Sequence, residues 1–363
     1  MRSRLPRRNF IHATGAFALA PALARSATGA WPPAEGDGVP SICLGAGANA
    51  GEKEMRRLRQ IGVDHVLMGG PPIPWKEADL RALVERFRKG GLTVDNLMIY
   101  GFPKAIYGKP GRDEEIDQVN ASIRAAGAAG IPVVEYNFYS HRLTEGYYEE
   151  LGRGGAGMTA YDYDRSKDLP PLPDVGAHSL DAMWANATYF LKAVVPVAEA
   201  AGVRLALHPS DPPVPLSRGS GQIMATLEGW KRLVMIVDSP VNGITYDCGV
   251  TCEMGEDPVA VCRWFGERDR INHAHYRNVR VRRPYLAYTE VFPDEGQVEM
   301  FAVMKELVRQ RYPRALYPEH PRALDADREA PGFDPYYPGG GGYAGLVYNV
   351  AYTKAMIQAA LAG

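Results

Sequence analysis

Four side chains that bind divalent metals well each follow a short apolar run in the second half of the sequence. They are His208, Asp247, His275 and Glu319, and the thiol of Cys248 is an alternative ligand beside Asp247. Two imidazoles and two carboxylates form a ligand set for a transition metal and leave positions open for water or substrate. A single histidine after a strand is more often a helix cap or a core residue. Four such strand ends in succession therefore predict one divalent metal site.

The apolar runs belong to a regular alternation that extends along most of the chain. Short apolar runs predict strands and longer amphipathic segments predict helices, in eight pairs. The strands are expected at Ser41–Gly45, Asp64–Met68, Thr93–Tyr100, Pro132–Phe138, Arg204–His208, Gly243–Asp247, Arg270–His275 and Ala315–Glu319. Eight β/α pairs predict an α/β fold, the (β/α)8 TIM barrel, in which the carboxyl ends of the strands form the site.

Two segments depart from this alternation. The longest insertion, about His141–His178, is rich in glycine and proline and is expected to be a loop over the top of the barrel. The basic run Arg280–Arg283 is expected to lie in a solvated loop after the seventh strand.

The first 30 residues predict an export signal. Four arginines precede an apolar stretch and then small residues, which is the order of a signal peptide. Arg7-Arg8 followed by Asn-Phe-Ile is typical of a twin-arginine signal, which predicts periplasmic delivery of a folded protein. A basic disordered tail is the alternative. Residues 31–40 are then a linker, and residues 41–363 form a single catalytic domain.

Composition limits the classes of function. The 363 residues carry 41 Lys+Arg and 42 Asp+Glu, so the net charge of −1 argues against a nucleic-acid-binding protein. Neither the signal peptide nor the rest of the chain predicts stable membrane anchoring. Four cysteines are too few for a disulfide scaffold, and the sequence leaves open whether they are thiols or form a bridge. Assembly into a homo-oligomer is also left open.

Several segments resemble one enzyme family, the mannonate dehydratases of the xylose-isomerase-like TIM-barrel superfamily. The most specific segment is His-Pro-Ser-Asp-Pro-Pro at 208–213. Gly130-Ile131-Pro132, Tyr136-Asn137-Phe138, His275-Tyr276-Arg277, Pro318-Glu319-His320 and Gly342-Tyr343 match in the same order, so the similarity spans nearly the whole mature chain. The resemblance implies dehydration of D-mannonate to 2-keto-3-deoxygluconate with Mn²⁺ or Fe²⁺.

The family holds its metal with His, Cys, His and Asp. The resemblance makes His208 and His275 ligands, and it places Asp247 at the family's cysteine and Glu319 at the family's aspartate. This richer carboxylate set is closer to the isomerases and epimerases of the superfamily, and Cys248 stays the alternative to Asp247.

Three further residues are candidates for catalysis. Tyr343 matches the family's proton-transferring tyrosine and follows the glycine run Gly339–Gly342, which would let the backbone approach substrate; the alternative is a packed aromatic residue. Arg277 could bind a substrate carboxylate through two hydrogen bonds or form a surface ion pair. His320 could donate a proton or support Glu319.

Four residues are expected to contact substrate. Asp211, Asn137 and Asp164 lie in segments that match the family. His273 has the same strand parity as His275, and its alternative is a barrel-interior residue that supports the site.

Three functions remain open at this stage. The first is a metal-dependent sugar-acid dehydratase. The second is a metal-dependent sugar isomerase or epimerase, which would move a proton without expelling water. The third is a periplasmic sugar-acid-binding protein without catalysis.

Overall fold

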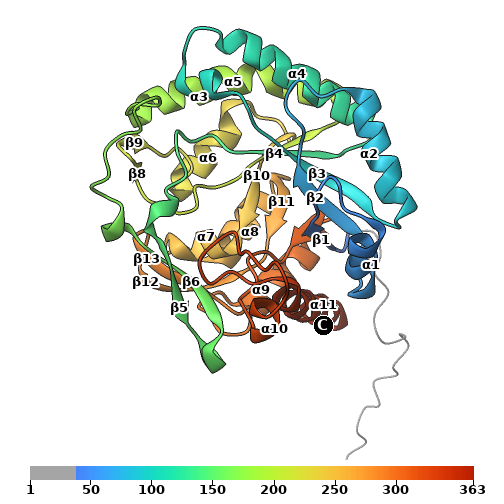
Figure 1. Cartoon of the computed structure of the whole chain (residues 1–363). Coiled ribbons are helices and arrows are strands. Elements are labelled where there is room, and N and C mark those ends of the chain that lie inside the picture. The colour runs from blue at the N-terminus through green and yellow to red at the C-terminus, as the bar shows by residue number, and fades with distance from the viewer. Residues whose placement is uncertain (1–37) are drawn as a thin grey trace, which may run out of the picture. The chain divides into compact units, whose positions relative to one another are not determined.

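A closed barrel of eight parallel strands organises the chain (Figure 1). The computed structural model describes residues 38–363; the predicted signal peptide and most of the predicted linker lie outside the described residues. The strands follow one another around the barrel and the last pairs with the first: β1 Ser41–Gly45, β2 His65–Gly69, β3 Thr93–Ile99, β4 Val133–Tyr136, β7 Arg204–Leu207, β10 Asn242–Asp247, β11 Ile271–His275 and β14 Ala315–Tyr317. The predicted TIM barrel is confirmed, with strand ends that differ by up to two residues.

The helices cover the outside of the barrel and bury an apolar layer against it. The main ones are α1 Glu52–Gln60, α2 Glu77–Lys89, α4 Arg112–Ala128, α5 Leu180–Ala201, α6 Leu227–Ile236, α8 Pro258–Gly266, α9 Met300–Arg309 and α11 Tyr343–Ala362, with shorter α3 Pro103–Tyr107, α7 Cys248–Glu253 and α10 Asp325–Arg328. Local signals set their ends. The Ser179 hydroxyl accepts a hydrogen bond from the Ala182 N–H at the start of α5, and Gly202 ends this helix at φ 66°.

The long insertion is not a loop, which corrects the sequence expectation. It contains β5 Tyr147–Leu151 and β6 Gly157–Asp162, with the 3-10 turns Thr144–Gly146, Arg153–Gly155 and Tyr163–Arg165 around them. These strands join β12 Asn278–Arg283 and β13 Ala287–Val291 in an antiparallel sheet of order β12-β13-β6-β5, which lies beside the barrel in Figure 1. A small hairpin, β8 Leu216–Ser217 and β9 Ser220–Gly221, follows β7.

The basic run Arg280–Arg283 belongs to β12, so the expectation of a solvated loop is also wrong. β12 is an edge strand with β13 as its single partner, and its three arginines are exposed. Charged residues are common on edge strands because they discourage pairing with another chain. The charged residues of this segment indicate exposure, but its pairing with β13 is formed only in the folded chain and cannot be seen in the sequence.

Candidate active site

The four predicted metal ligands come together where their strands end. One ligand atom from each of His208, Asp247, His275 and Glu319 can be chosen so that all four lie within 4.8 Å of one another. His275 is central: its Nδ1 lies 3.3 Å from Nε2 of His208 and 3.1 Å from Oε1 of Glu319. It also lies 3.8 Å from Oδ2 of Asp247. These distances suit a shared ion after small shifts, because ligands at about 2.1 Å from one metal lie roughly 3–4 Å apart.

Local contacts orient these side chains. The Nδ1 atom of His208 is hydrogen-bonded to the Pro209 carbonyl at 2.7 Å, which leaves Nε2 directed at the cluster. Asp247 ends β10 and caps α7, because its Oδ1 accepts a hydrogen bond from the Val250 N–H at 2.8 Å. Its Oδ2 remains on the side of His275.

Cys248, the alternative ligand, turns away from this group. Its thiol donates a hydrogen bond to the carbonyl of Arg277 at 3.2 Å and is buried in the core. Asp247 therefore lies within the group of candidate ligands, and the Cys248 thiol does not. All four cysteines are free thiols.

The electrostatics of the cluster favour a cation. Burial lowers the pKa of His275, but the carboxylates of Glu319, Glu135 and Asp247 outweigh burial and raise this pKa to about 9. Burial raises the pKa of Asp247, although nearby Arg277 opposes the rise. The Oε1 atom of Glu319 is buried and lies 3.1 Å from both Nδ1 of His275 and Nε of Arg277, although neither contact has the geometry of a hydrogen bond. Since buried charges require a partner, this donor set fits a divalent ion.

A cavity of about 490 Å³ opens above His208, His275 and Glu319. That volume is in the usual range for a small-molecule site. Asn137, predicted to contact substrate, lines this cavity, and so does Asp211. A second cavity of about 320 Å³ shares Arg142, Glu319 and His320 with the first, along with Tyr317 and Tyr336.

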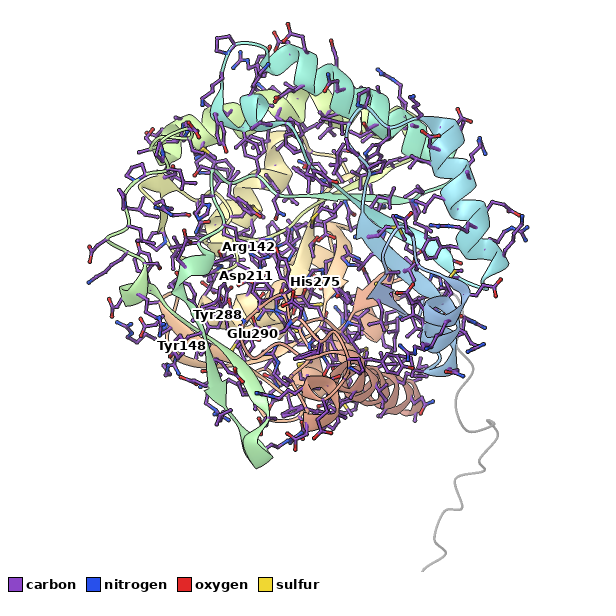
Figure 2. All side chains as sticks on the ribbon, viewed as in Figure 1. Arg142, Tyr148, Asp211, His275, Tyr288 and Glu290 are labelled. Carbon is purple, nitrogen blue, oxygen red and sulfur yellow. The ribbon has the colours of Figure 1, made fainter. Side chains whose placement is uncertain are left out.

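Asp211 is saturated by the protein itself. Its Oδ1 accepts hydrogen bonds from Tyr147 and Tyr288, both at 2.8 Å. Its Oδ2 lies 3.2 Å from Nη2 of Arg142 and 3.4 Å from Nη2 of Arg277. Figure 2 shows Arg142, Asp211 and Tyr288 close together. Asp211 therefore positions its neighbours at the cavity wall, and its predicted contact with substrate stays a prediction.

Arg277 is neither a substrate clamp nor a surface ion pair. Its side chain is 3% exposed. Carboxylates of five residues surround its guanidinium: Glu253 at 2.7 Å, Asp247 and Glu319 at 3.1 Å, Asp211 at 3.4 Å and Glu290 at 3.9 Å. Each of its three nitrogens thus faces a protein carboxylate. Arg142 lines the cavity instead. The sequence alone does not single out this residue, because it lies in the insertion expected to be a loop.

His320 occupies the rim between the two cavities. Its Nδ1 lies 3.0 Å from Oε2 of Glu290 and its Nε2 lies 3.4 Å from Oε2 of Glu319. Burial lowers the pKa of His320, but the two carboxylates outweigh burial and raise this pKa. The backbone of His320 has φ 46°, which is uncommon for a residue other than glycine. Such strain is frequent where a side chain must be held in a functional position.

Tyr343 lies elsewhere, which contradicts its predicted role in proton transfer. It begins α11, and its hydroxyl donates a hydrogen bond to the Arg57 carbonyl of α1 at 2.9 Å. The preceding glycines pack on the chain's own backbone: a Cβ at Gly339 would lie 2.4 Å from the Met158 carbonyl oxygen. The helix therefore starts with Tyr343 facing α1, and Tyr336 is the tyrosine of this segment that lines both cavities.

Two of the expected substrate contacts are wrong. Asp164 is exposed and pairs with Arg283 at 2.8 Å and Lys167 at 3.3 Å, because the turn that carries it ends at the outer sheet. His273 lies inside the barrel below His275, with ring centroids 5.1 Å apart, as its alternative reading stated. It lines a separate cavity at the opposite end of the barrel.

Comparisons with known proteins find relatives of one kind. The sequence profile of the D-mannonate dehydratase (UxuA) family matches residues 174–360. A mannonate dehydratase of Streptococcus pneumoniae (strain 70585) is 34% identical over 291 residues, covering 72% of this chain and 79% of the relative. A mannonate dehydratase of Thermotoga maritima is 30% identical over 321 residues, covering 78% of this chain and 89% of the relative.

Solved structures give the same picture. The crystal structure of a mannonate dehydratase from Streptococcus suis serotype 2 superposes with a TM-score of 0.79 at 27% identity, covering 89% of this chain and 95% of that one. A xylose isomerase-like TIM-barrel protein from Mycobacterium smegmatis, solved with magnesium, has a TM-score of 0.57 at 13% identity and covers 89% and 98% of the two chains. This second likeness concerns the fold alone.

We expect Arg277→Met to destabilise the chain by about 3–5 kcal/mol, because it leaves several buried carboxylates without a counter-ion. Urea unfolding without substrate measures this loss. Arg142→Met is the matched control: its side chain is 26% exposed and pairs with one carboxylate, so we expect a much smaller loss. Equal stability of the two variants would contradict the structural role of Arg277.

Proposed function

The chain belongs to the D-mannonate dehydratase family, and from that premise we propose that it is a metal-dependent hydro-lyase that converts a D-mannonate-like aldonate to a 2-keto-3-deoxy acid. The observation that carries the proposal is the convergence of four ligand side chains, of which His208, His275 and Glu319 line the floor of a cavity. These ligands come from consecutive barrel strands, at the end of the fold where TIM-barrel active sites form.

We assign the metal to His208, Asp247, His275 and Glu319. Mixed nitrogen and carboxylate ligands suit Mn²⁺ or Fe²⁺. The bound ion would offset the negative charge that develops on the substrate carboxylate when the neighbouring C2 proton is removed.

Arg142 is placed to orient the substrate carboxylate. Its Nε donates to the Asp211 carbonyl at 2.9 Å and its Nη2 pairs with the Asp211 carboxylate, so its position is set before substrate arrives. Neither contact uses Nη1. A fixed guanidinium at the cavity wall suits a planar carboxylate, since arginine donors match its geometry. The guanidinium carbon lies 5.1 Å from the centre of the Tyr337 ring, which gives further support.

His320 is the candidate for protonating the departing C3 hydroxyl. Glu290 holds its Nδ1, and Arg322 holds Glu290 through a 2.7 Å contact. Tyr337 packs against the imidazole with ring centroids 5.2 Å apart. Held on one nitrogen and packed on one face, the ring presents Nε2 beside Glu319. A histidine in this arrangement can act as a general acid when substrate lies within hydrogen-bonding distance.

The direct test is an assay of the purified chain, loaded with Mn²⁺ or Fe²⁺, on a panel of aldonates that includes D-mannonate. We expect a 2-keto-3-deoxy acid, detected by ultraviolet absorption, and loss of the activity on chelation. His208→Ala should lower metal content and rate together. Deuterium exchange without dehydration would instead indicate an isomerase or epimerase, and tight binding without turnover a binding protein.

We expect His320→Gln to lower kcat by roughly 10²–10⁴, the usual loss for a general acid, while metal content is retained. Steady-state kinetics and elemental analysis give both quantities. His178→Gln is a suitable control, because the ring of His178 is hydrogen-bonded to the Val175 carbonyl, stacks on Tyr107 and does not line the cavity above the proposed metal ligands. Near-normal turnover of His320→Gln would assign the proton to another group.

We also propose that residues 1–30 export the folded chain through the twin-arginine route. The support is the sequence order of arginines, apolar stretch and small residues. Replacing Arg7 and Arg8 by lysine should leave the protein in the cytoplasmic fraction, as immunoblots of cell fractions would show. Unchanged periplasmic delivery of the lysine variant would exclude the twin-arginine route. Among residues 38–363, no helix combines the length and apolar character that crossing a membrane requires.

A further inference from the structure

We propose that the barrel interior binds a second divalent cation through Glu135, His273 and the Nε2 atom of His275. One ligand atom from each of these residues lies within 4.8 Å of the others. The proposal rests on the proposed function in one respect: it takes His275 as a ligand of the first ion through Nδ1. The ring of His275 would then bridge two ions as an imidazolate, one on each nitrogen, and its N–H protons would pass to solvent as the cations bind.

The first observation is the charge of Glu135. Its side chain is 2% exposed, on β4 inside the barrel. Its oxygens accept hydrogen bonds from two neutral groups, the Asn96 amide and the Thr245 hydroxyl, both at 2.7 Å. Among the described residues its one ion-pair contact is with Nε2 of His275, at 3.7 Å. A buried carboxylate without a strong counter-ion is costly unless it is paired or coordinates a metal.

The second observation is that the two imidazoles leave nitrogens unused. The Nε2 atoms of His273 and His275 are both buried, and neither has a hydrogen-bond partner among residues 38–363. Buried polar atoms are nearly always satisfied, so two unpartnered nitrogens beside one buried carboxylate need an explanation. A cation between them would satisfy all three groups. Two imidazoles and one carboxylate are ligands that Zn²⁺, Mn²⁺, Fe²⁺ and Co²⁺ share.

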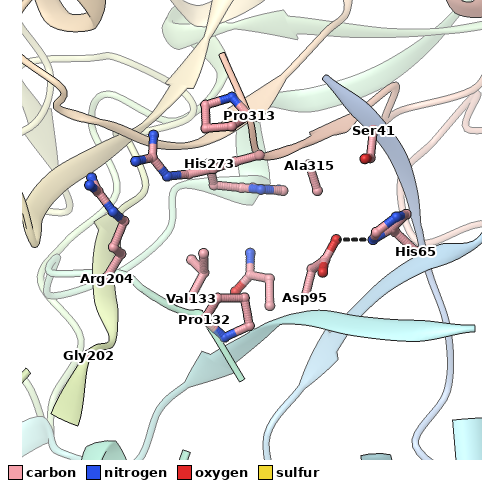
Figure 3. A pocket seen from close by; sticks show the side chains of 12 residues that line it. Ser41, His65, Asp95, Pro132, Val133, Gly202, Arg204, His273, Pro313 and Ala315 are labelled. Atoms are coloured by element: carbon pink, nitrogen blue, oxygen red, sulfur yellow. Dashed lines mark ion pairs between the residues drawn. The ribbon is translucent and has the colours of Figure 1, made fainter. Parts of the chain in front are cut away.

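The third observation is access. Glu135 and His275 line the cavity of about 490 Å³ in which substrate would bind. His273 lines a lower cavity of about 240 Å³ at the amino ends of the strands. Figure 3 shows the His273 side chain extending into this lower cavity, with the paired Asp95 and His65 on another wall. The three ligands therefore lie between two cavities, which provides the entry path that a buried metal site needs.

Neighbouring residues hold the ligands in place. Asn96 on β3 and Thr245 on β10 each bind one oxygen of Glu135 and so fix the carboxylate between them. The rings of His273 and His275 are nearly perpendicular, at 89°. Carboxylates fixed by hydrogen bonds make better metal ligands than mobile ones, because less order is lost when the ion binds.

The test counts ions in the absence of substrate. The chain is stripped with chelator, loaded with excess Mn²⁺, freed of unbound ion and analysed for metal per chain. We expect two ions in the wild type and one in His273→Gln. We also expect the Mn²⁺ paramagnetic resonance signal per ion to be weaker in the wild type than in His273→Gln, because two Mn²⁺ ions joined by one imidazolate ring interact magnetically.

His65→Gln is the matched control. His65 lines the same lower cavity but pairs with Asp95 and is not part of the proposed ligand group, so this variant should keep two ions. If His273→Gln does not fold, as judged by circular dichroism, Glu135→Gln is counted instead, with the same expectation of one ion.

One ion in the wild type would overturn the proposal, and so would two ions in His273→Gln or loss of the second ion in His65→Gln. These results are separable from the proposed function. A chain with one ion that dehydrates aldonates would end this inference and leave the function standing. A chain with two ions and no dehydratase activity would support this inference and contradict the proposed function.

Discussion

The buried guanidinium of Arg277 is the interaction on which the site depends. Arg277 follows β11 and reaches carboxylates carried by β10, α7, β13 and the segments after β7 and β14. Each of those carboxylates would be costly to bury alone. Arginine can serve several of them because its five N–H donors spread in one plane. The barrel ends and the outer sheet are therefore joined through one side chain.

Arg277 connects two parts of the site, the candidate metal group in the barrel and the residues held by the outer sheet. Toward the barrel, Arg277 contacts Asp247 and Glu319, the carboxylates of the metal group. Toward the outer sheet, it contacts Asp211, which in turn holds Arg142 and two tyrosines. Arg142 also pairs with Asp211 and Arg322 with Glu290, so three guanidinium groups face five carboxylates and an excess of negative charge remains. Such an excess favours a cation below the cavity, and Arg142 provides positive charge on the cavity wall.

The inserted segments supply the substrate side of the site. Arg142 precedes β5, Tyr147 begins that strand, and Tyr288 lies on β13. The barrel thus provides the proposed metal ligands, while tyrosines of the antiparallel sheet hold Asp211 and, through it, Arg142 at the cavity wall. This division is usual for TIM barrels, in which loops change the chemistry and the strands preserve the frame.

The sequence by itself determined the frame and the metal group. Hydrophobic periodicity located all eight barrel strands, and the rule that strand ends converge brought His208, Asp247, His275 and Glu319 to one place. These inferences succeeded because the apolar pattern of each strand is a local property of the sequence. In a parallel barrel, the residues at the carboxyl ends of all strands lie at the same end of the fold. The family resemblance supplied the reaction in the same way, through short ordered segments.

Only the tertiary structure decided which polar groups satisfy one another. Arg277 looked free to bind substrate because its partners, such as Asp211 and Glu253, are distant in sequence. Glu135 drew no attention inside an apolar run, yet folding places it beside His275. Tyr343 follows the glycine run that matches the family, but its hydroxyl is hydrogen-bonded to α1 and does not face the cavity. Pairing of buried charges depends on which side chains the fold brings within a few ångströms, and residue types and spacing along the chain do not specify that distance.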